Sequence, residues 1–245
     1  MATLFGPRIC IITGKFLGLC LALCLLAAAA HAEIVEAENY DAFWLWAGVN
    51  SQPALGSAKE IYLLAGEIRG QKTPQIISQR GATPHLNGPT IWVVYRVQTL
   101  AWNDDVLREV LAHVETWRTA GNNISGLQID FDAKTKHLDQ YGAFLSKLRA
   151  GLPQQYRLSV TGLLDWSANG DPKDLDALAG VVDEVVLQIY QGRHVIPGYA
   201  RYFTKVGRLK VPFKIGLLQG GEWTTPAGVK THAMFKGYVV FLVNP

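Results

Sequence analysis

The 245-residue chain has only three cysteines, Cys10, Cys20 and Cys24, and all of them fall within its first 32 residues. A leucine precedes each of the last two, whereas a lipoprotein signal needs a small residue there, so we expect no lipid anchor. The rest of the chain contains no cysteine. This absence excludes disulfides, thiolate metal ligands and cysteine nucleophiles from that part of the protein.

Apolar runs long enough to span a bilayer are also missing. The run from Phe16 to Ala30 follows Arg8 and Lys15 and precedes the small-residue pattern Ala30-His31-Ala32. These features are typical of a signal peptide, which we predict over residues 1–32. An uncleaved anchor helix is the alternative, but the run is shorter than the roughly 20 residues that cross a membrane. We therefore expect a periplasmic or secreted protein without stable membrane insertion after signal cleavage.

An excess of one charge is absent as well. The formal charge is +3, and removal of the signal takes away two basic residues and no acids, which leaves +1. Neither nucleic acid nor an acidic membrane is therefore an expected partner. Glycine-rich nucleotide loops, His-x-x-x-His pairs and acidic cation loops are missing, so neither a cofactor nor a metal is predicted. The sequence gives no indication of oligomeric state.

Eight short apolar segments, most of them separated by helical patterns, follow the predicted signal. The expected strands are 42–48, 60–65, 90–97, 124–133, 157–164, 182–190, 211–218 and 238–243. The expected helices are 75–79, the segment from the N-cap Asn103 to Gly121, 138–150, 172–178, 198–206 and 229–235.

This alternation predicts an α/β protein of the (β/α)8 type, a TIM barrel, as a single domain over residues 33–245. Removing 32 of the 245 residues leaves 213, which is few for this fold, and the first half shows few helices. We therefore expect a small barrel that is partly eroded in its first half. A doubly wound open sheet is the alternative topology.

The strand expected at 124–133 has an unusual composition. Gln128, Asp130 and Asp132 alternate with apolar residues, so the three polar side chains share one face. A strand covered on both faces should be mostly apolar. The polar face therefore indicates a functional site at the carboxyl end of this strand.

Polar and aromatic residues also follow other expected strands. They are Trp46, Arg96, Asp165, Trp166, Gln188, Tyr190, Glu222 and Trp223. In a barrel the carboxyl ends of all strands meet at one rim, so these side chains are expected to converge with Asp130 and Asp132. Carboxylates and aromatic rings are the groups that glycoside hydrolysis and sugar binding require. Carbohydrate is therefore the expected partner.

Structural roles are the alternative for several of these residues. In that interpretation Asp130 is a buried carboxylate that caps a loop or pairs with Arg96. Asp132 caps the helix that follows, and Trp46 belongs to the core together with Trp44 and Trp92. The whole protein is then an exported structural or interaction module.

Two motifs carry a resemblance to a known family. Residues 125–132, Ser-Gly-Leu-Gln-Ile-Asp-Phe-Asp, resemble the strand-four motif Asp-Gly-x-Asp-x-Asp-x-Glu of chitinase-type glycoside hydrolases. Residues 188–190, Gln-Ile-Tyr, resemble the strand-six Met-x-Tyr of the same enzymes. The wider segment 126–223 resembles a family of uncharacterised exported bacterial proteins predicted to be glycoside-hydrolase-like barrels.

The resemblance implies a role for three residues. Asp132 occupies the place of the proton-donating Glu, and Asp130 that of the Asp that orients the substrate acetamido group or tunes the donor. Tyr190 takes the place of the Tyr that hydrogen-bonds this acetamido group, whose carbonyl is the internal nucleophile. The implied activity is that of a glycosidase, in which Asp130, Asp165 or Glu222 assists Asp132.

The motif also departs from the family pattern. Ser125 and Gln128 replace two of its acids, and Asp132 is one methylene shorter than Glu, which draws the carboxyl back by about 1.5 Å. A proton donor must lie within hydrogen-bond distance of the leaving oxygen. A catalytically inactive barrel that binds glycans is therefore a further alternative.

Overall fold

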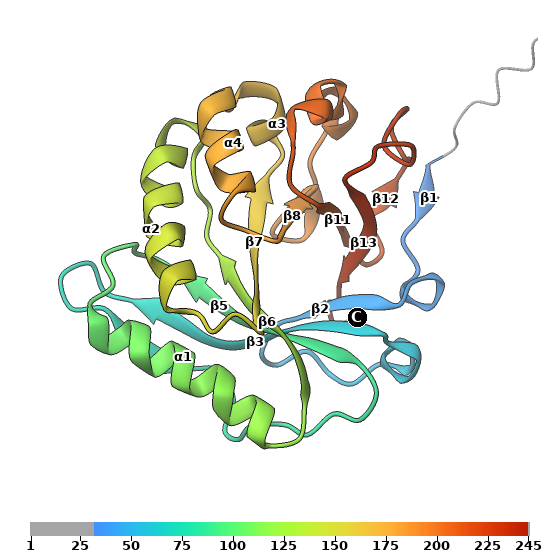
Figure 1. The fold of residues 1–245 in the computed structure, drawn as a ribbon. Helices are drawn as coiled ribbons and strands as arrows, with labels where there is room; N and C mark the ends of the chain where they lie inside the picture. Colours follow the sequence, from blue (N-terminus) through green and yellow to red (C-terminus); the bar gives the residue numbers. More distant parts are fainter. Residues whose placement is uncertain (1–31, 245) are drawn as a thin grey trace, which may run out of the picture. The chain divides into compact units, whose positions relative to one another are not determined.

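The computed structural model describes residues 32–244, and the predicted signal peptide, apart from Ala32, lies outside these described residues. Eight parallel strands form a closed barrel in the order β2-β3-β5-β6-β7-β8-β11-β13, and β13 pairs with β2 to complete it (Figure 1). The barrel strands are β2 (Ala42–Leu45), β3 (Glu60–Arg69), β5 (Thr90–Val97), β6 (Asn123–Asp130), β7 (Arg157–Leu163), β8 (Glu184–Gln188), β11 (Phe213–Leu218) and β13 (Phe235–Phe241). The predicted (β/α)8 barrel is confirmed, and the open-sheet alternative is excluded.

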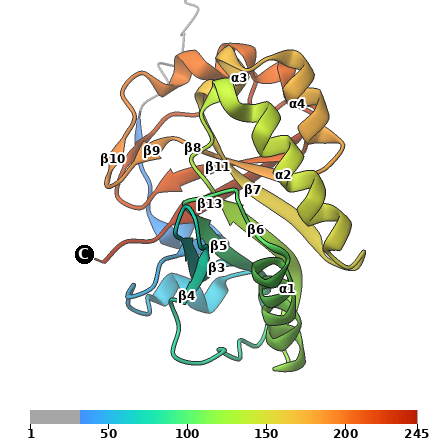
Figure 2. The same ribbon diagram turned by 90° about the vertical axis from the view of Figure 1, so that its left-hand side faces the viewer.

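The α-helices follow the middle strands β5, β6 and β7, and α1, α2 and α4 pack on the outside of the barrel (Figure 2). The segment between β2 and β3 contains only a short 3-10 helix, and that between β3 and β5 contains no helix, which confirms the eroded first half. The α-helices are α1 (Asp104–Thr119), α2 (Leu138–Gly151), α3 (Asp165–Asn169) and α4 (Pro172–Ala179). The 3-10 helices are η1 (Ala37–Asn39), η2 (Pro53–Ser57), η3 (Thr135–His137) and η4 (Tyr199–Arg208).

Local sequence explains where α1 and α4 begin. The side chain of Asn103 accepts a hydrogen bond from the backbone N–H of Val106 at 2.9 Å, and acidic residues occupy the first turn of α1. Asp171 caps α4 in the same manner by accepting from the N–H of Lys173 at 2.8 Å, and Pro172 is the first helical residue. Both predicted helix starts are confirmed.

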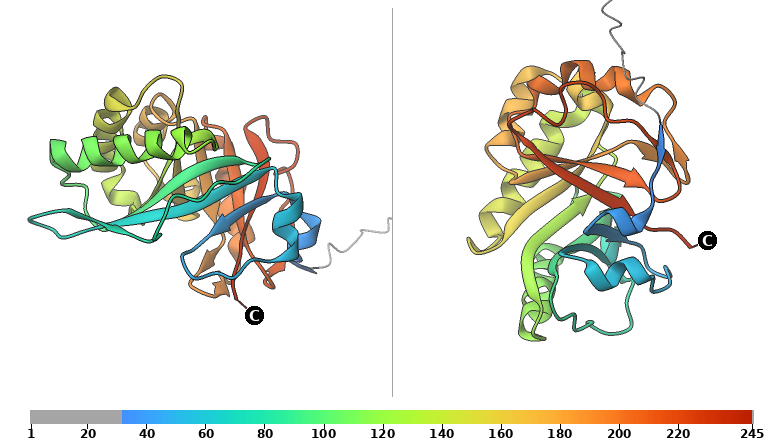
Figure 3. Two further views of the ribbon diagram at one scale, coloured as in Figure 1. Left: turned by 90° about the horizontal axis from the view of Figure 1, so that it is seen from below. Right: turned by 90° about the vertical axis from the view of Figure 1, so that its right-hand side faces the viewer.

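Three of the expected elements differ in the structure. Residues 75–79 were expected to be helical, but Gln75–Ser78 form strand β4, antiparallel to the end of β3. Strand β2 has only four residues, so the edge of β3 beyond Leu63 lacks a partner in the barrel, and β4 covers it. Figure 3 shows this hairpin extending past its neighbours. Residues 229–234 form turns and bends instead of a helix, with β13 beginning at Phe235, and the segment 198–206 is 3-10 rather than α-helical.

Two small antiparallel pairs lie outside the barrel sheet. The strand expected at 182–190 breaks after Gln188, and the chain continues as β9 (Tyr190–Gln191), which pairs with β10 (His194–Val195). After β11, the segment β12 (Glu222–Trp223) pairs with β1 (Glu33–Ile34). The first of these pairs borders the carboxyl ends of the barrel strands and so shapes the candidate site described below.

Side chains fill the barrel interior and form a cluster separate from the one between strands and helices. The rings of Tyr62 and Trp92 stack with centroids 5.7 Å apart, and Trp44 stacks on Phe241 at 5.1 Å. Trp44 and Trp92 therefore belong to the core, as the structural alternative proposed for them. Gly126 lies where a Cβ atom would be 1.9 Å from the carbonyl oxygen of Arg157, so only glycine fits at this position of β6.

A buried polar network occupies the amino-terminal half of the barrel. The ammonium of Lys214 contacts the carboxylates of Glu60 and Glu184, at 3.2 Å for Glu184, and donates to the hydroxyl of Tyr62 at 2.9 Å. Tyr62 donates to Glu184 at 2.7 Å, and Trp92 donates its indole N–H to Glu60 at 2.7 Å. Every charge in this network thus has a partner, as burial requires.

The network continues along the barrel interior to Gln128 on β6. Ser159 donates to Glu184 at 3.0 Å and accepts from the side-chain amide of Gln128 at 3.0 Å. The amide oxygen of Gln128 accepts from the indole N–H of Trp44 at 2.6 Å. Gln128 is fully buried. These bonds make Gln128 the polar floor below the carboxyl end of β6.

Candidate functional site at the carboxyl end of the barrel

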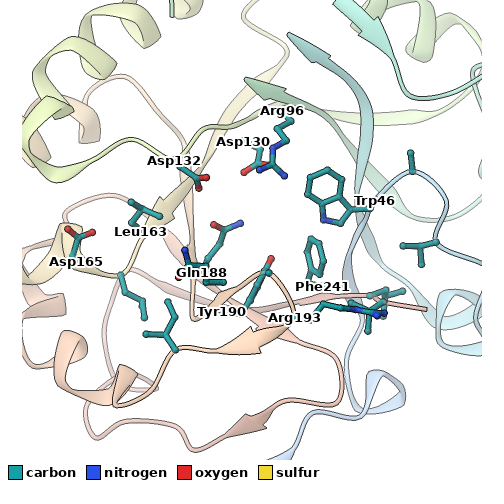
Figure 4. A pocket seen from close by; sticks show the side chains of 18 of the residues that line it. Trp46, Arg96, Asp130, Asp132, Leu163, Asp165, Gln188, Tyr190, Arg193 and Phe241 are labelled. Carbon is teal, nitrogen blue, oxygen red and sulfur yellow. The ribbon is translucent and has the colours of Figure 1, made fainter. Parts of the chain in front are cut away.

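A cavity of about 1050 Å³ opens at the carboxyl ends of the strands. Residues that follow β2, β5, β6, β7, β8 and β13 line it, so it lies where (β/α)8 barrels carry their sites. Figure 4 shows Asp130, Asp132 and Asp165 on one side of the cavity, and Trp46, Phe241 and Tyr190 on the other. The volume suits a ligand of several rings rather than a single small ion.

Asp130 is the last residue of β6 and lies at the inner wall of the cavity. Its side chain accepts a hydrogen bond from the hydroxyl of Thr161 on the neighbouring strand β7, at 2.9 Å, and the residue is only 7% exposed. Burial raises the pKa of Asp130 to about 6. The Thr161 hydroxyl and the Arg96 guanidinium oppose this rise, whereas the negative charges of Asp132 and Glu67 add to it. Asp130 therefore exchanges its proton near neutral pH.

Asp132 lies beyond the strand, at the centre of a tight three-residue turn. The backbone N–H of Ala133 donates to the carbonyl of Phe131 at 2.7 Å, which closes the turn around Asp132. Two further bonds fix the turn: the N–H of Phe131 donates to the Thr161 hydroxyl at 3.2 Å, and the indole of Trp166 donates to the carbonyl of Ala133 at 2.8 Å. Asp132 is exposed, and its carboxyl faces the cavity (Figure 4).

Two of the structural roles considered for these acids, a helix cap by Asp132 and an ion pair of Asp130 with Arg96, are not formed within residues 32–244, although Asp130 is a buried carboxylate as that alternative describes. The residue before η3 is Lys134 and the one before α2 is His137, so Asp132 caps neither helix. Asp130 lies close enough to Arg96 for the guanidinium to lower its pKa. Within residues 32–244, however, the two side chains form no ion pair shorter than 4.0 Å. Both carboxyls remain directed at the cavity.

Three aromatic rings form the opposite wall of the cavity, here called the aromatic wall: Trp46, Tyr190 and Phe241. The ring of Phe241 lies 5.0 Å from that of Tyr190 and 6.0 Å from that of Trp46, centroid to centroid. Burial raises the pKa of the Tyr190 phenol well above 10, and the charges of Asp130 and Asp132 raise it further, although the Gln188 amide opposes them. Tyr190 is therefore a neutral hydroxyl at physiological pH, able to donate a hydrogen bond into the cavity.

Four of the residues expected from the sequence do not line this cavity. Gln128 lies beneath the cavity, and its side-chain amide is hydrogen-bonded to Trp44 and Ser159. Trp166 is fully buried, and its indole holds the Asp132 turn from behind. Glu222 and Trp223 pair with β1, and Trp223 is buried against Tyr199, so the prediction that these two meet the others is corrected. The residues that do line the cavity are Trp46, Arg96, Asp130, Asp132, Asp165, Gln188 and Tyr190.

Sequence reasoning missed several lining residues. Phe241 completes the aromatic wall, but it lies in the uniformly apolar segment Val239-Val240-Phe241 of the last strand, where the sequence does not show which side chains face the barrel interior. Lys134, Arg193 and Asn244 come from loops, Asn169 ends the short helix α3 and Tyr202 lies in η4, and no periodicity marks any of them. The loop after β2 holds Asn244 in place, because the backbone N–H of Asn50 donates a hydrogen bond to the Asn244 side chain at 2.8 Å.

Within residues 32–244, no three His, Cys, Asp or Glu side chains are grouped so that they could hold a metal ion. No helix of this part of the chain is both long enough and apolar enough to cross a membrane.

Residues 89–198 match a family described as "Domain of unknown function (DUF3142)". No protein with curated annotation matches the sequence. A chitinase from Bacteroides thetaiotaomicron has a similar structure, with a TM-score of 0.50 and 12% identity over 73% of this chain and 68% of that one. At this identity the likeness shows the fold, and it establishes a distant similarity to chitinase-type barrels.

Two further structures match less well. The spore cortex-lytic enzyme SleL of Bacillus cereus gives a TM-score of 0.46 and 14% identity over 72% of this chain and 49% of that one. The xylanase and alpha-amylase inhibitor protein XAIP-II of Scadoxus multiflorus gives 0.48 and 10% identity over 81% and 90%. The chain therefore spans about half the length of the SleL protein.

Proposed function

We propose that this barrel is a glycoside hydrolase that binds a glycan in the cavity and cleaves a glycosidic bond there, with Asp132 as the proton donor. The observation that carries the proposal is the placement of Asp130 and Asp132 on the same cavity as the aromatic wall. Carboxyl groups supply a proton and a negative charge, and aromatic rings pack on the apolar faces of sugars. The fold likeness to a chitinase supports the same class of substrate.

The two carboxyls have different environments, which suits a division of roles. Asp130 is buried and holds its proton up to about pH 6, whereas Asp132 is exposed in the cavity. In the proposed reaction Asp132 presents the proton to the glycosidic oxygen of the bound substrate, and Asp130 stands beside it at the inner wall of the cavity.

Bond cleavage then follows the course that the resemblance to chitinase-type enzymes implies. The proton of Asp132 passes to the leaving oxygen as the bond to the anomeric carbon breaks. The acetamido carbonyl of the same sugar attacks this carbon, and Tyr190 donates a hydrogen bond to the acetamido group. Water then adds to the anomeric carbon as the bond between this carbon and the acetamido oxygen breaks, which restores the acetamido group, and one proton of the water returns to Asp132.

A catalytically inactive glycan-binding barrel is the second candidate. One observation favours it: the position of the donor holds Asp132 instead of Glu, so the carboxyl is set back by about 1.5 Å. Both candidates share the cavity and the aromatic wall, and both fit an exported protein, which we propose from the signal sequence.

An array of oligosaccharides probed with purified protein tests the proposal. Each glycan that binds is then incubated with the protein, and the products are analysed by mass spectrometry. Release of shorter oligosaccharides supports hydrolysis. Binding without release supports the second candidate, and failure to bind any glycan contradicts both.

A further inference from the structure

The cavity carries basic side chains that the proposed hydrolysis does not use. Arg96, Lys134 and Arg193 line it together with the three aspartates. The three basic groups equal the three aspartates in number, and Asp130 holds its proton up to about pH 6, so the lining carries no excess of negative charge. A neutral glycan needs no such positive charge, and a negatively charged one does.

Arg96 is the most strictly positioned of these cations. Its guanidinium carbon lies 4.8 Å from the centroid of the Trp46 ring, which holds the group in a cation–π contact. The residue is half-buried at the end of β5 and points into the cavity beside Asp130 (Figure 4). A guanidinium held in this way loses little further freedom when it binds a planar anion.

The guanidinium also has unused donors. Among residues 32–244, Arg96 makes no side-chain hydrogen bond and no ion pair within 4.0 Å, whereas Arg193 donates to the carbonyl of Asn244 at 2.6 Å. An arginine carries five N–H donors in a planar fork that matches the two oxygens of a carboxylate. A half-buried fork without a partner is costly unless a ligand or water takes those donors.

The stacking on Trp46 has a second consequence. Because Arg96 occupies one face of this indole, that face is not free to pack on a sugar ring. Phe241 and Tyr190 are then the rings that support the pyranose faces, and the part of the cavity beside Trp46 is a polar, cationic subsite.

We propose that Arg96 binds a carboxylate carried by the glycan, so that the substrate class is an acidic oligosaccharide with carboxylated sugars. This inference rests on the proposed function of the cavity. Two N–H groups of the Arg96 guanidinium donate hydrogen bonds to the two carboxylate oxygens. Lys134 and Arg193 at the cavity wall add to the electrostatic attraction.

Calorimetric titration with matched saccharides tests this assignment. The probes are a hyaluronan tetrasaccharide and an oligogalacturonide, each as the free acid and as the methyl ester, with neutral chitotetraose and a chondroitin sulfate tetrasaccharide for comparison. At least one free acid is expected to bind roughly tenfold to a hundredfold more tightly than its own ester. The ester keeps the sugar backbone and removes only the charge.

Variants connect that preference to Arg96. Arg96→Gln is expected to abolish the difference between acid and ester, and Arg96→Lys to retain part of it, because lysine keeps the charge without the fork. Arg108→Gln, an exposed arginine on α1, is the matched control and should change nothing. Thermal denaturation confirms that each variant is folded.

The outcomes separate this inference from the proposed function. If only chitotetraose binds, or if esters bind as well as acids, the carboxylate subsite is wrong while the glycan cavity stands. If the sulfated probe binds more tightly than hyaluronan and loses this advantage in Arg96→Gln, the guanidinium binds sulfate rather than carboxylate and the inference is overturned. An unchanged acid-over-ester preference in Arg96→Gln also overturns it. If none of these saccharides and no glycan of the array binds, both proposals fail.

Discussion

Thr161 on β7 donates its hydroxyl to the carboxyl of Asp130 on β6 at 2.9 Å, and the same hydroxyl oxygen accepts the backbone N–H of Phe131 at 3.2 Å. One side chain therefore positions two of the three aspartates of the cavity, Asp130 directly and Asp132 through its turn. The two acids differ in environment because the strand ends between them: the first is buried in the barrel, and the second is exposed in a loop.

The raised pKa of Asp130 predicts a pH-dependent stability. The folded protein holds this proton up to about pH 6, whereas an unfolded chain releases it near 3.8. Ionisation of this carboxyl in the unfolded chain, while the folded protein still holds the proton, therefore lowers the free energy of unfolding by about 3 kcal/mol between these two pH values, and by nothing below them. The free energy of unfolding of Asp130→Asn, measured relative to that of wild type, should therefore be about 3 kcal/mol higher at pH 7.5 than at pH 4. Urea denaturation at both pH values measures the difference.

The exposed Glu38→Gln serves as the control for that comparison, since its side chain is outside the barrel. A difference between wild type and Asp130→Asn that stays constant from pH 4 to pH 7.5 would show that Asp130 has an ordinary pKa.

Removal of the buried ammonium should destabilise the barrel strongly. Lys214→Met leaves Glu60 and Glu184 buried without their counter-charge, and breaking such a pair typically costs about 3–5 kcal/mol. Lys210→Met is the matched control, because Lys210 pairs with Asp176 at the exposed surface, where a pair contributes about 0–1 kcal/mol. Equal losses of unfolding free energy in the two variants would contradict the assigned role of the network.

How far the sequence predicts this structure depends on the range of the interactions. Local signals were sufficient for α1, because Asn103 and the following acids cap it, and for β5, whose expected bounds 90–97 match the structure. The alternation in β6 correctly set Asp130 toward the barrel interior.

Long-range contacts were beyond sequence reasoning. Gln128 bonds to Trp44, 84 residues away, so nothing near it in sequence tells a buried amide from a ligand-binding one. Glu222 and Trp223 follow β11 as expected, but their pairing with β1 draws them away from the cavity. The residues 75–78 became a strand only because the short β2 leaves an edge of β3 uncovered.

The indole of Trp166 is expected to act on turnover through the Asp132 turn. Trp166→Phe removes the hydrogen bond to the carbonyl of Ala133 and leaves glycan contacts untouched, so kcat should fall while Kd changes little. Trp117→Phe is the matched control: this buried indole donates to His113 on α1, outside the cavity, and its loss should lower stability only. Equal kcat values for the two variants would show that the turn needs no support from Trp166.

The aromatic wall is expected to contribute to affinity. Phe241→Leu keeps an apolar side chain but removes the ring that packs beside Tyr190, and should raise the Kd for a bound glycan roughly threefold to tenfold. Phe213→Leu makes the same chemical change on β11 in the layer between strands and helices, where no ligand reaches it. Calorimetry on both variants distinguishes a ligand contact from a general packing effect, since only the first should weaken binding.

The central claim is that Asp132 donates the proton for glycosidic cleavage, and one measurement tests it most directly. Binding and turnover of an oligosaccharide that the array identifies are measured in parallel for wild type and Asp132→Asn. The account predicts that Asp132→Asn lowers turnover by about 10²–10⁴-fold while it stays folded and binds the glycan with a similar Kd. Unchanged turnover in Asp132→Asn would contradict the assignment, and a wild-type protein that binds the glycan without cleaving it would contradict catalysis itself.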